Sequence, residues 1–166
     1  TRHTRKGEVD GKNYFLKTRK EFKKMIANDG FLEHADVYGN YYGTPKAYVM
    51  DQVAQGKDII LEIDPQGALQ VKKNYPNGVF VFIVPPSLSE LSKRIYNRGT
   101  DAVDVIKKRL SAATSELAYA SKYDYIVVND EVEKATTKVN NIVSTEHLRA
   151  GRTFYIVDEI VKGENK

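Results

Sequence analysis

Hydrophobic and polar positions alternate in two different ways along this chain, and the change falls near Thr44. Before that point, short apolar stretches lie between polar turns. They predict a strand, a helix and a second strand, at 13–16, 19–28 and 31–38. Thr18 is followed three residues later by Glu21, a capping-box pattern that marks the start of this helix.

From Pro45 onward, helices alternate with short apolar strands. The strands predicted here are almost continuous runs of β-branched and aromatic residues, at 59–63, 79–84 and 125–128. Such runs are typical of strands buried on both faces, as in a parallel sheet covered by helices. We therefore expect an α/β protein.

Helix starts in the second part are marked by capping residues and by prolines at first helical positions. Thr44-Pro45 begins a helix that ends at Gly56, Asp64-Pro65 begins the next, and Ser87 to Glu90 form a second capping box. A long helix is predicted at 101–121, with an apolar stripe opposite a charged face, as in a mobile cover or a surface helix. The segment 153–157 fits either a short strand or part of a helix.

Length and composition limit the functional classes. The 166 residues, 41% of them hydrophobic, suit one compact unit. No apolar run approaches the ~20 residues of a membrane span and the charged opening is no signal sequence, so we expect a cytoplasmic protein. With no cysteine and three scattered histidines, redox and zinc chemistry are disfavoured.

The charge pattern favours small phosphates over nucleic acid. The net charge is +4, and arginines gather in three places instead of forming a continuous basic stripe with stacking aromatics.

The first candidate site is the basic opening. Arg2 and Arg5 could fork onto one phosphate, since each guanidinium offers two parallel donors, and the Tyr14 hydroxyl could add a third group. A solvated basic turn is the alternative.

The second candidate is Glu33 on the strand at 31–38. A carboxylate projecting into a cleft can accept from the ring N–H and the exocyclic amine of guanine, whereas adenine has no such donor pair. Glu33 could equally be a half-exposed edge residue, and Tyr41 and Tyr42 could be core aromatics.

The third candidate is the carboxylate pair Glu62 and Asp64. They end a predicted parallel strand, where open α/β sheets bind ligands, and could hold Mg²⁺ directly or through water. Asp64 before Pro65 is also a good helix N-cap.

The fourth candidate is a set of arginines on two helices, Arg94, Arg98 and Arg109. Such residues can close onto a transferring phosphoryl group and stabilise its charge. Surface salt bridging is the alternative, chiefly for Arg94.

Together these segments resemble the guanylate kinase family, to about Arg149. The resemblance rests on Thr-Arg-x-x-Arg-x-Gly-Glu, Gly-Asn-Tyr-Tyr-Gly-Thr, Ile-Asp-x-Gln-Gly, Pro-Pro-Ser, Arg-Gly-Thr and Val-Asn-Asp, at 1–8, 39–44, 63–67, 85–87, 98–100 and 128–130. It implies the three-layer P-loop nucleoside monophosphate kinase fold, with a parallel core sheet, helices on both faces, a small β-rich GMP-binding subdomain and a helical lid. The implied division is a GMP-binding subdomain, core, lid and C-terminal core, at 1–44, 45–90, 91–118 and 119–166.

The resemblance also implies roles for individual residues. The GMP phosphate would be held by Arg2, Arg5, Tyr14 and Tyr42, and the guanine read by Glu33 and Thr44. Glu62 and Asp64 would lie near the ribose, base or Mg²⁺. The phosphoryl groups and ATP would be contacted by Arg94, Arg98 and Arg109, with Asn129 beside the adenine.

The implied reaction is phosphoryl transfer from ATP to GMP, with Mg²⁺ as cofactor. The family's Gly-rich phosphate loop has no match in this sequence, although its amides and lysine cradle ATP phosphates. We therefore expect that an N-terminal segment is omitted and that the chain is catalytically incomplete without it.

Two other functions fit the same residues. Guanylate-kinase-like modules of scaffold proteins bind phosphopeptides through a reused phosphate site, and a kinase could act on another nucleotide. GMP and ATP are the expected partners, without nucleic acid or membrane, for a monomer or a homodimer.

Overall fold

The computed structural model describes residues 1–4, 7–11, 14–37, 39–97 and 103–163, with the side chains of 103–109 outside that description. These residues form two compact units, Thr1–Gly78 and Val79–Lys166. Within the described part of the chain, no helix is both long enough and apolar enough to span a membrane.

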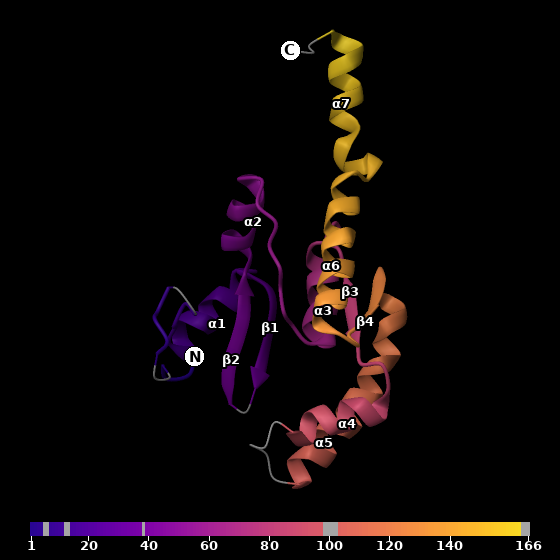
Figure 1. Ribbon diagram of the computed structural model, residues 1–166. Helices are drawn as coiled ribbons and strands as arrows, with labels where there is room; N and C mark the ends of the chain where they lie inside the picture. The colour runs from indigo at the N-terminus through magenta and orange to yellow at the C-terminus, as the bar shows by residue number, and fades with distance from the viewer. Residues whose placement is uncertain (5–6, 12–13, 38, 98–102, 164–166) are drawn as a thin grey trace. The chain divides into compact units, whose positions relative to one another are not determined.

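The first unit is built around an antiparallel hairpin. Its strands are β1 (Phe31–Val37) and β2 (Asn40–Pro45), and their register places Glu33 opposite Thr44. The helices of this unit are α1 (Arg19–Ala27), α2 (Lys46–Ala54) and α3 (Pro65–Asn74), and Figure 1 shows α1 and α2 beside the hairpin.

Aromatic stacking joins α1 to this hairpin. The ring of Phe22 on α1 stacks on Phe31 with centroids 4.3 Å apart and on Tyr41 at 5.4 Å. Phe22, Phe31 and Leu32 are all buried. Burial of such side chains contributes about 1.5–3 kcal/mol each, so this cluster anchors the strand that carries Glu33.

The second unit contains a parallel strand pair, β3 (Val81–Val84) and β4 (Tyr125–Val128). Between them lie α4 (Leu88–Asn97), α5 (Val103–Glu116) and a 3₁₀ turn, η1 (Leu117–Lys122). The chain continues through α6 (Val132–His147) and α7 (Ala150–Lys162). A parallel pair with helical connections is the βαβ arrangement that the apolar runs predict.

Most predicted helix starts are confirmed. Both bonds of the Thr18–Glu21 capping box are present, and Asp64 caps α3 through a bond from the Gly67 amide. At α4 only half of the second box forms, since the Ser87 hydroxyl accepts from the Glu90 amide. The predicted helix at 101–121 becomes 3₁₀ from Leu117, and its first two residues lie outside the described part.

Two predictions about strands are wrong. Residues 59–63 form no strand, because a strand needs a hydrogen-bonded neighbour and none of the described residues pairs with them. Tyr14 to Leu16 make only an isolated bridge, since Leu16 bonds to the Asp10 side chain instead of to a strand. Residues 40–45 form β2, a strand that was not predicted.

The open question about 153–157 is also answered: this segment belongs to α7. The run predicted at 79–84 begins as a strand two residues later, because the Phe80 amide donates to the Asp124 side chain.

Candidate functional site

Glu33 and Thr44 form a hydrogen-bonded pair in the first unit, in which Glu33 is buried and Thr44 half-buried. They face each other across β1 and β2, and the Thr44 hydroxyl donates to Glu33 Oε1 at 2.7 Å. Glu33 is only 8% exposed. A buried carboxylate requires donors, and one hydroxyl leaves acceptor capacity for others. The predicted base-reading residue is thus buried rather than half-exposed.

The N-terminus of α3 lies against the same carboxylate. Asp64 Oδ1 accepts from the Gly67 amide at 2.7 Å. A Cβ at Gly67 would lie 3.3 Å from Glu33 Oε2 and 3.4 Å from Asp64 Oδ1, so this glycine permits the close approach of helix and carboxylate. The second and third candidate sites therefore meet at Gly67.

Glu62 does not join this group in the described contacts. It is exposed in the irregular stretch before α3, within the segment that was predicted as a strand. Successive side chains point to opposite faces only in a paired strand. Because this stretch is unpaired among the described residues, nothing fixes the direction of the Glu62 side chain toward a cleft.

A basic corner lies at the start of the first unit. Arg2 donates through Nη1 to Glu8 Oε2 at 2.7 Å and through Nη2 to Glu8 Oε1 at 2.5 Å, and its guanidinium is 5.0 Å from the Tyr14 ring centroid. These bonds to Glu8 raise the pKa of Arg2, with smaller contributions from Tyr14 and Tyr42. Arg5 lies outside the described residues.

The position of this corner is fixed by β2. Thr1 Oγ1 accepts from the Tyr41 amide at 2.9 Å, which places the neighbouring Arg2 beside the strand that carries Tyr42. Arg2, Tyr14 and Tyr42 are thus brought together, and the bidentate grip on Glu8 shows that the Arg2 guanidinium can hold a two-oxygen anion.

In the second unit Arg94 is tied to the end of β4. Its guanidinium donates to Glu90 Oε1 at 2.9 Å, to the Asn129 carbonyl at 2.9 Å and to the Asp130 carbonyl at 3.2 Å. The salt-bridge alternative is the arrangement in this structure. Arg98 lies outside the described residues, and Arg109 lies on α5 with its side chain outside the description.

Asn129 follows β4, at the carboxyl end of the parallel strand pair. Its amide continues the pairing by donating to the Val84 carbonyl at 2.8 Å. Its side-chain Oδ1 is buried and has no hydrogen-bond partner among the residues that the structure describes. An unpaired buried acceptor at the end of parallel strands is suited to a ligand that donates a hydrogen bond.

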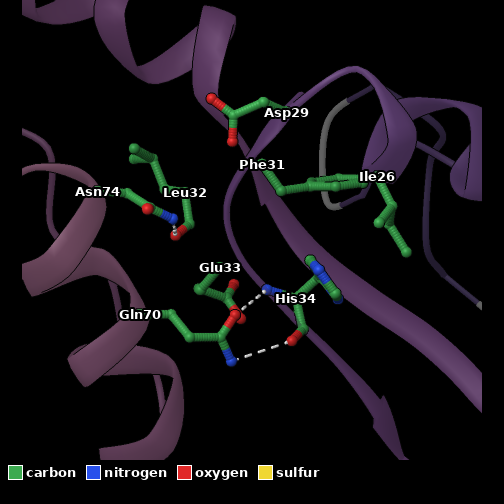
Figure 2. A pocket seen from close by; sticks show the side chains of 8 residues that line it. All are labelled: Ile26, Asp29, Phe31, Leu32, Glu33, His34, Gln70 and Asn74. Atoms are coloured by element: carbon green, nitrogen blue, oxygen red, sulfur yellow. Dashed lines mark hydrogen bonds between the residues drawn. The ribbon is translucent and has the colours of Figure 1, made fainter.

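Two functional candidates were not predicted from the sequence, Gln70 and Asn74 on α3. They line a small cavity of about 80 Å³ beside Glu33 and bond to the backbone of β1 (Figure 2). The available signal was two amide side chains four positions apart on a helix whose Ala68 and Val71 are buried.

The fold and these groups are typical of an α/β enzyme that binds a nucleoside monophosphate. A protein-family model described as guanylate kinase matches residues 1–146. The chain belongs to the guanylate kinase family, and it is an ATP:GMP phosphotransferase, which transfers a phosphoryl group from ATP to GMP.

Two curated relatives illustrate the similarity. A guanylate kinase of Caldanaerobacter subterraneus subsp. tengcongensis is 53% identical over 152 residues, which are 92% of this chain and 74% of the relative. One of Clostridium acetobutylicum is 52% identical over 161 residues, 97% of this chain and 76% of the relative.

A solved structure supports the fold. The crystal structure of guanylate kinase from Anaplasma phagocytophilum aligns with a TM-score of 0.72 and 35% identity, over 92% of this chain and 74% of that one. The predicted family and reaction are thus confirmed, and the mixed α/β architecture is consistent with the family's fold.

Proposed function

We propose that the first unit binds GMP through two groups of side chains, one for the base and one for the phosphate. Glu33 and Thr44 read the guanine, and Arg2, Arg5, Tyr14 and Tyr42 hold the phosphate. The observation that carries this proposal is the buried Glu33 carboxylate, which is hydrogen-bonded to Thr44 and lies beside Gly67, because it presents an acceptor with little exposure to solvent.

The chemistry of the base supports this assignment. Guanine offers a ring N–H and an exocyclic amine on one edge, and a carboxylate can accept from both. Adenine presents no such pair, so binding it would leave a buried acceptor unpaired at a cost of about 1–3 kcal/mol. Thr44 contributes by orienting Glu33 through its hydroxyl.

For the phosphate, the proposal rests on the fork of Arg2. The Glu8 carboxylate accepts hydrogen bonds from both terminal nitrogens of the Arg2 guanidinium. A phosphate presents two oxygens in a similar arrangement. GMP would therefore replace Glu8 as the partner of Arg2, while Glu62 and Asp64 would lie near the ribose, base or metal.

The lid and ATP contacts are proposed for the second unit. Arg98 and Arg109 would stabilise the transferring phosphoryl group, and Asn129 would contact the adenine through its unpaired Oδ1. Arg94 would join them at the phosphoryl group or hold the Asn129 loop through the bonds it makes here. The attacking atom is a phosphate oxygen of GMP, so catalysis consists of positioning and charge stabilisation.

Mg²⁺ would accompany ATP. No group of three possible ligands gathers among the residues that the structure describes. Mg²⁺ is commonly held by one or two carboxylates together with substrate phosphates and water. Asp64 would contact the ion through water, and the ion would neutralise charge on the ATP oxygens.

The finer architecture is proposed from the family. The chain would divide into a GMP-binding subdomain, core, lid and C-terminal core (1–44, 45–90, 91–118 and 119–166) of the three-layer P-loop kinase fold. The enzyme would act in the cytoplasm as a monomer or a homodimer, which light scattering after gel filtration distinguishes.

The decisive experiment replaces Glu33 with glutamine. Because an amide cannot accept from both guanine donors, we expect the KM for GMP to rise about tenfold or more, with the KM for ATP within about twofold of wild type. Steady-state kinetics with each substrate varied in turn measure both constants. An unchanged KM for GMP would remove Glu33 from base recognition.

A further inference from the structure

The edge of β1 that faces α3 is closed by side-chain amides instead of by another strand. Gln70 Oε1 accepts from the His34 amide at 3.1 Å, and Gln70 Nε2 donates to the His34 carbonyl at 3.2 Å. Asn74 Nδ2 donates to the Leu32 carbonyl at 2.8 Å. Figure 2 shows both amides directed toward β1 from the same helix.

One face of α3 carries all of these contacts. Gly67, Gln70 and Asn74 are spaced three and four residues apart, so they lie in a row along the helix. Gly67 lies against the Glu33 carboxylate. The two amides bond to the backbone of Leu32 and His34, the residues on either side of Glu33. We call these two side chains the amide clamp.

The amide clamp holds the part of β1 whose register with β2 determines which way the Glu33 side chain points. Neighbouring residues in a strand point to opposite faces, so a slip of one residue would carry Glu33 away from its site. A strand edge without a neighbour is weakly constrained, whereas an amide that both donates to and accepts from one residue fixes its position.

We propose that Gln70, assisted by Asn74, is a positioning residue for guanine recognition: it holds β1 so that the Glu33 carboxylate stays in place against Thr44. This inference rests on the proposed role of Glu33 as the base-reading residue. Gln70 acts through the backbone of His34 and need not touch the nucleotide.

The competing explanation is a purely structural role, in which the amides only satisfy buried backbone groups. Loss of such a role would lower stability and leave the choice between nucleotides unchanged. A positioning role instead changes the ratio of kcat/KM for GMP to that for IMP, because IMP lacks the exocyclic amine that a correctly placed carboxylate accepts from.

The test replaces Gln70 with methionine, which keeps the length of the side chain and removes both bonds. We expect the KM for GMP to rise about five- to thirtyfold, the KM for ATP to stay within about twofold, and the GMP/IMP preference to fall. Gln55→Met is the matched control, because the Gln55 amide is exposed and bonds to the exposed side chains of Asp51 and Lys57.

A double-mutant cycle with Glu33→Gln separates this inference from the proposed function. If Glu33→Gln alone leaves the KM for GMP unchanged, the proposed function is wrong. If Glu33→Gln raises that KM and Gln70→Met has little further effect in its background, the clamp acts through Glu33 as proposed. Equal effects of Gln70→Met in both backgrounds would overturn the clamp.

Asn74→Leu provides a second route should Gln70→Met fail to fold. Asn74 is exposed and makes one bond to β1, so the loss is smaller. We expect about a two- to fivefold rise in the KM for GMP together with a lower GMP/IMP preference. A change in thermal stability alone, with both kinetic values unchanged, would overturn the inference.

Discussion

Glu146 is buried in the second unit, as Glu33 is in the first, and it is only 4% exposed. Its Oε1 accepts from the Tyr125 hydroxyl at 2.6 Å and from Arg149 Nη2 at 2.5 Å. The bond from Tyr125 is the main cause that lowers the pKa of Glu146, and Arg149 adds to it against the opposing effect of burial. Whereas Glu33 meets one hydroxyl, Glu146 also has a cation, which suits a structural role.

The lowered pKa makes this carboxylate a source of acid sensitivity. A group whose pKa is lower in the folded state stabilises the fold above its unfolded value, here 4.5, and loses that contribution as the pH falls through the folded value. We expect Glu146→Gln to lose less stability than wild type between about pH 6 and about pH 3. At neutral pH this variant should melt a few degrees lower.

Thermal melts across this pH range, followed by circular dichroism, make the comparison. Glu133→Gln is the control, since Glu133 is exposed on the first turn of the same helix. Parallel curves for Glu146→Gln and wild type would mean that Glu146 does not contribute to acid unfolding.

At the scale of elements, helix starts are predicted from the sequence because their causes are local. Thr18 and Glu21 bond across three residues, and Asp64 bonds to Gly67 across the same distance. Strands depend on a partner far along the chain. Residues 59–63 have the composition of a buried strand without a described partner, and β2 forms because its polar residues pair with β1.

The same distinction separates the predicted from the unpredicted parts of the site. Glu33 is identified as a candidate by its side-chain chemistry, which can be read directly from the sequence, and Thr44 by the resemblance of its motif to the family. Gln70 and Asn74 bind backbone carbonyls and an amide, and every residue carries these groups. No pattern of residue types marks which backbone groups a helix will contact, so the clamp is visible only in the structure.

The proposed contact of Asp64 with a metal-bound water can be separated by substitution from its observed role as the cap of α3. Asparagine caps a helix about as well as aspartate, so we expect Asp64→Asn to keep the free energy of unfolding within about 0.5 kcal/mol while kcat falls and the Mg²⁺ requirement rises. Asp64→Ala should also lose about 1 kcal/mol of stability.

Urea unfolding and Mg²⁺ titrations of activity provide the two measurements. Thr18→Ala is the matched control, because it removes the cap of α1 and should lose similar stability with unchanged kinetics. If Asp64→Asn keeps the kcat and the Mg²⁺ dependence of wild type, Asp64 only caps α3 and does not contact the metal-bound water.

At the scale of the whole molecule, the proposed contacts for the two substrates fall on different units. The proposed base and phosphate contacts of GMP lie within Thr1–Gly78, whereas the proposed ATP and phosphoryl contacts, Asn129, Arg94, Arg98 and Arg109, lie within Val79–Lys166. Each unit has its own strand pair and buried residues. Binding of GMP should therefore slow amide exchange in the strands of the first unit before it affects those of the second.

Hydrogen exchange tests this division. GMP at about a hundredfold over its dissociation constant stabilises the bound form by ~2.7 kcal/mol. At short exchange times, when amides exchange by local opening, we expect slower exchange in β1, β2 and the first turn of α3, with β4 unchanged. AMP at the same concentration is the control; it carries the same phosphate but lacks guanine's donor pair, so it should slow these amides less than GMP does. Equal protection of β4 by GMP would show that the GMP site extends into the second unit.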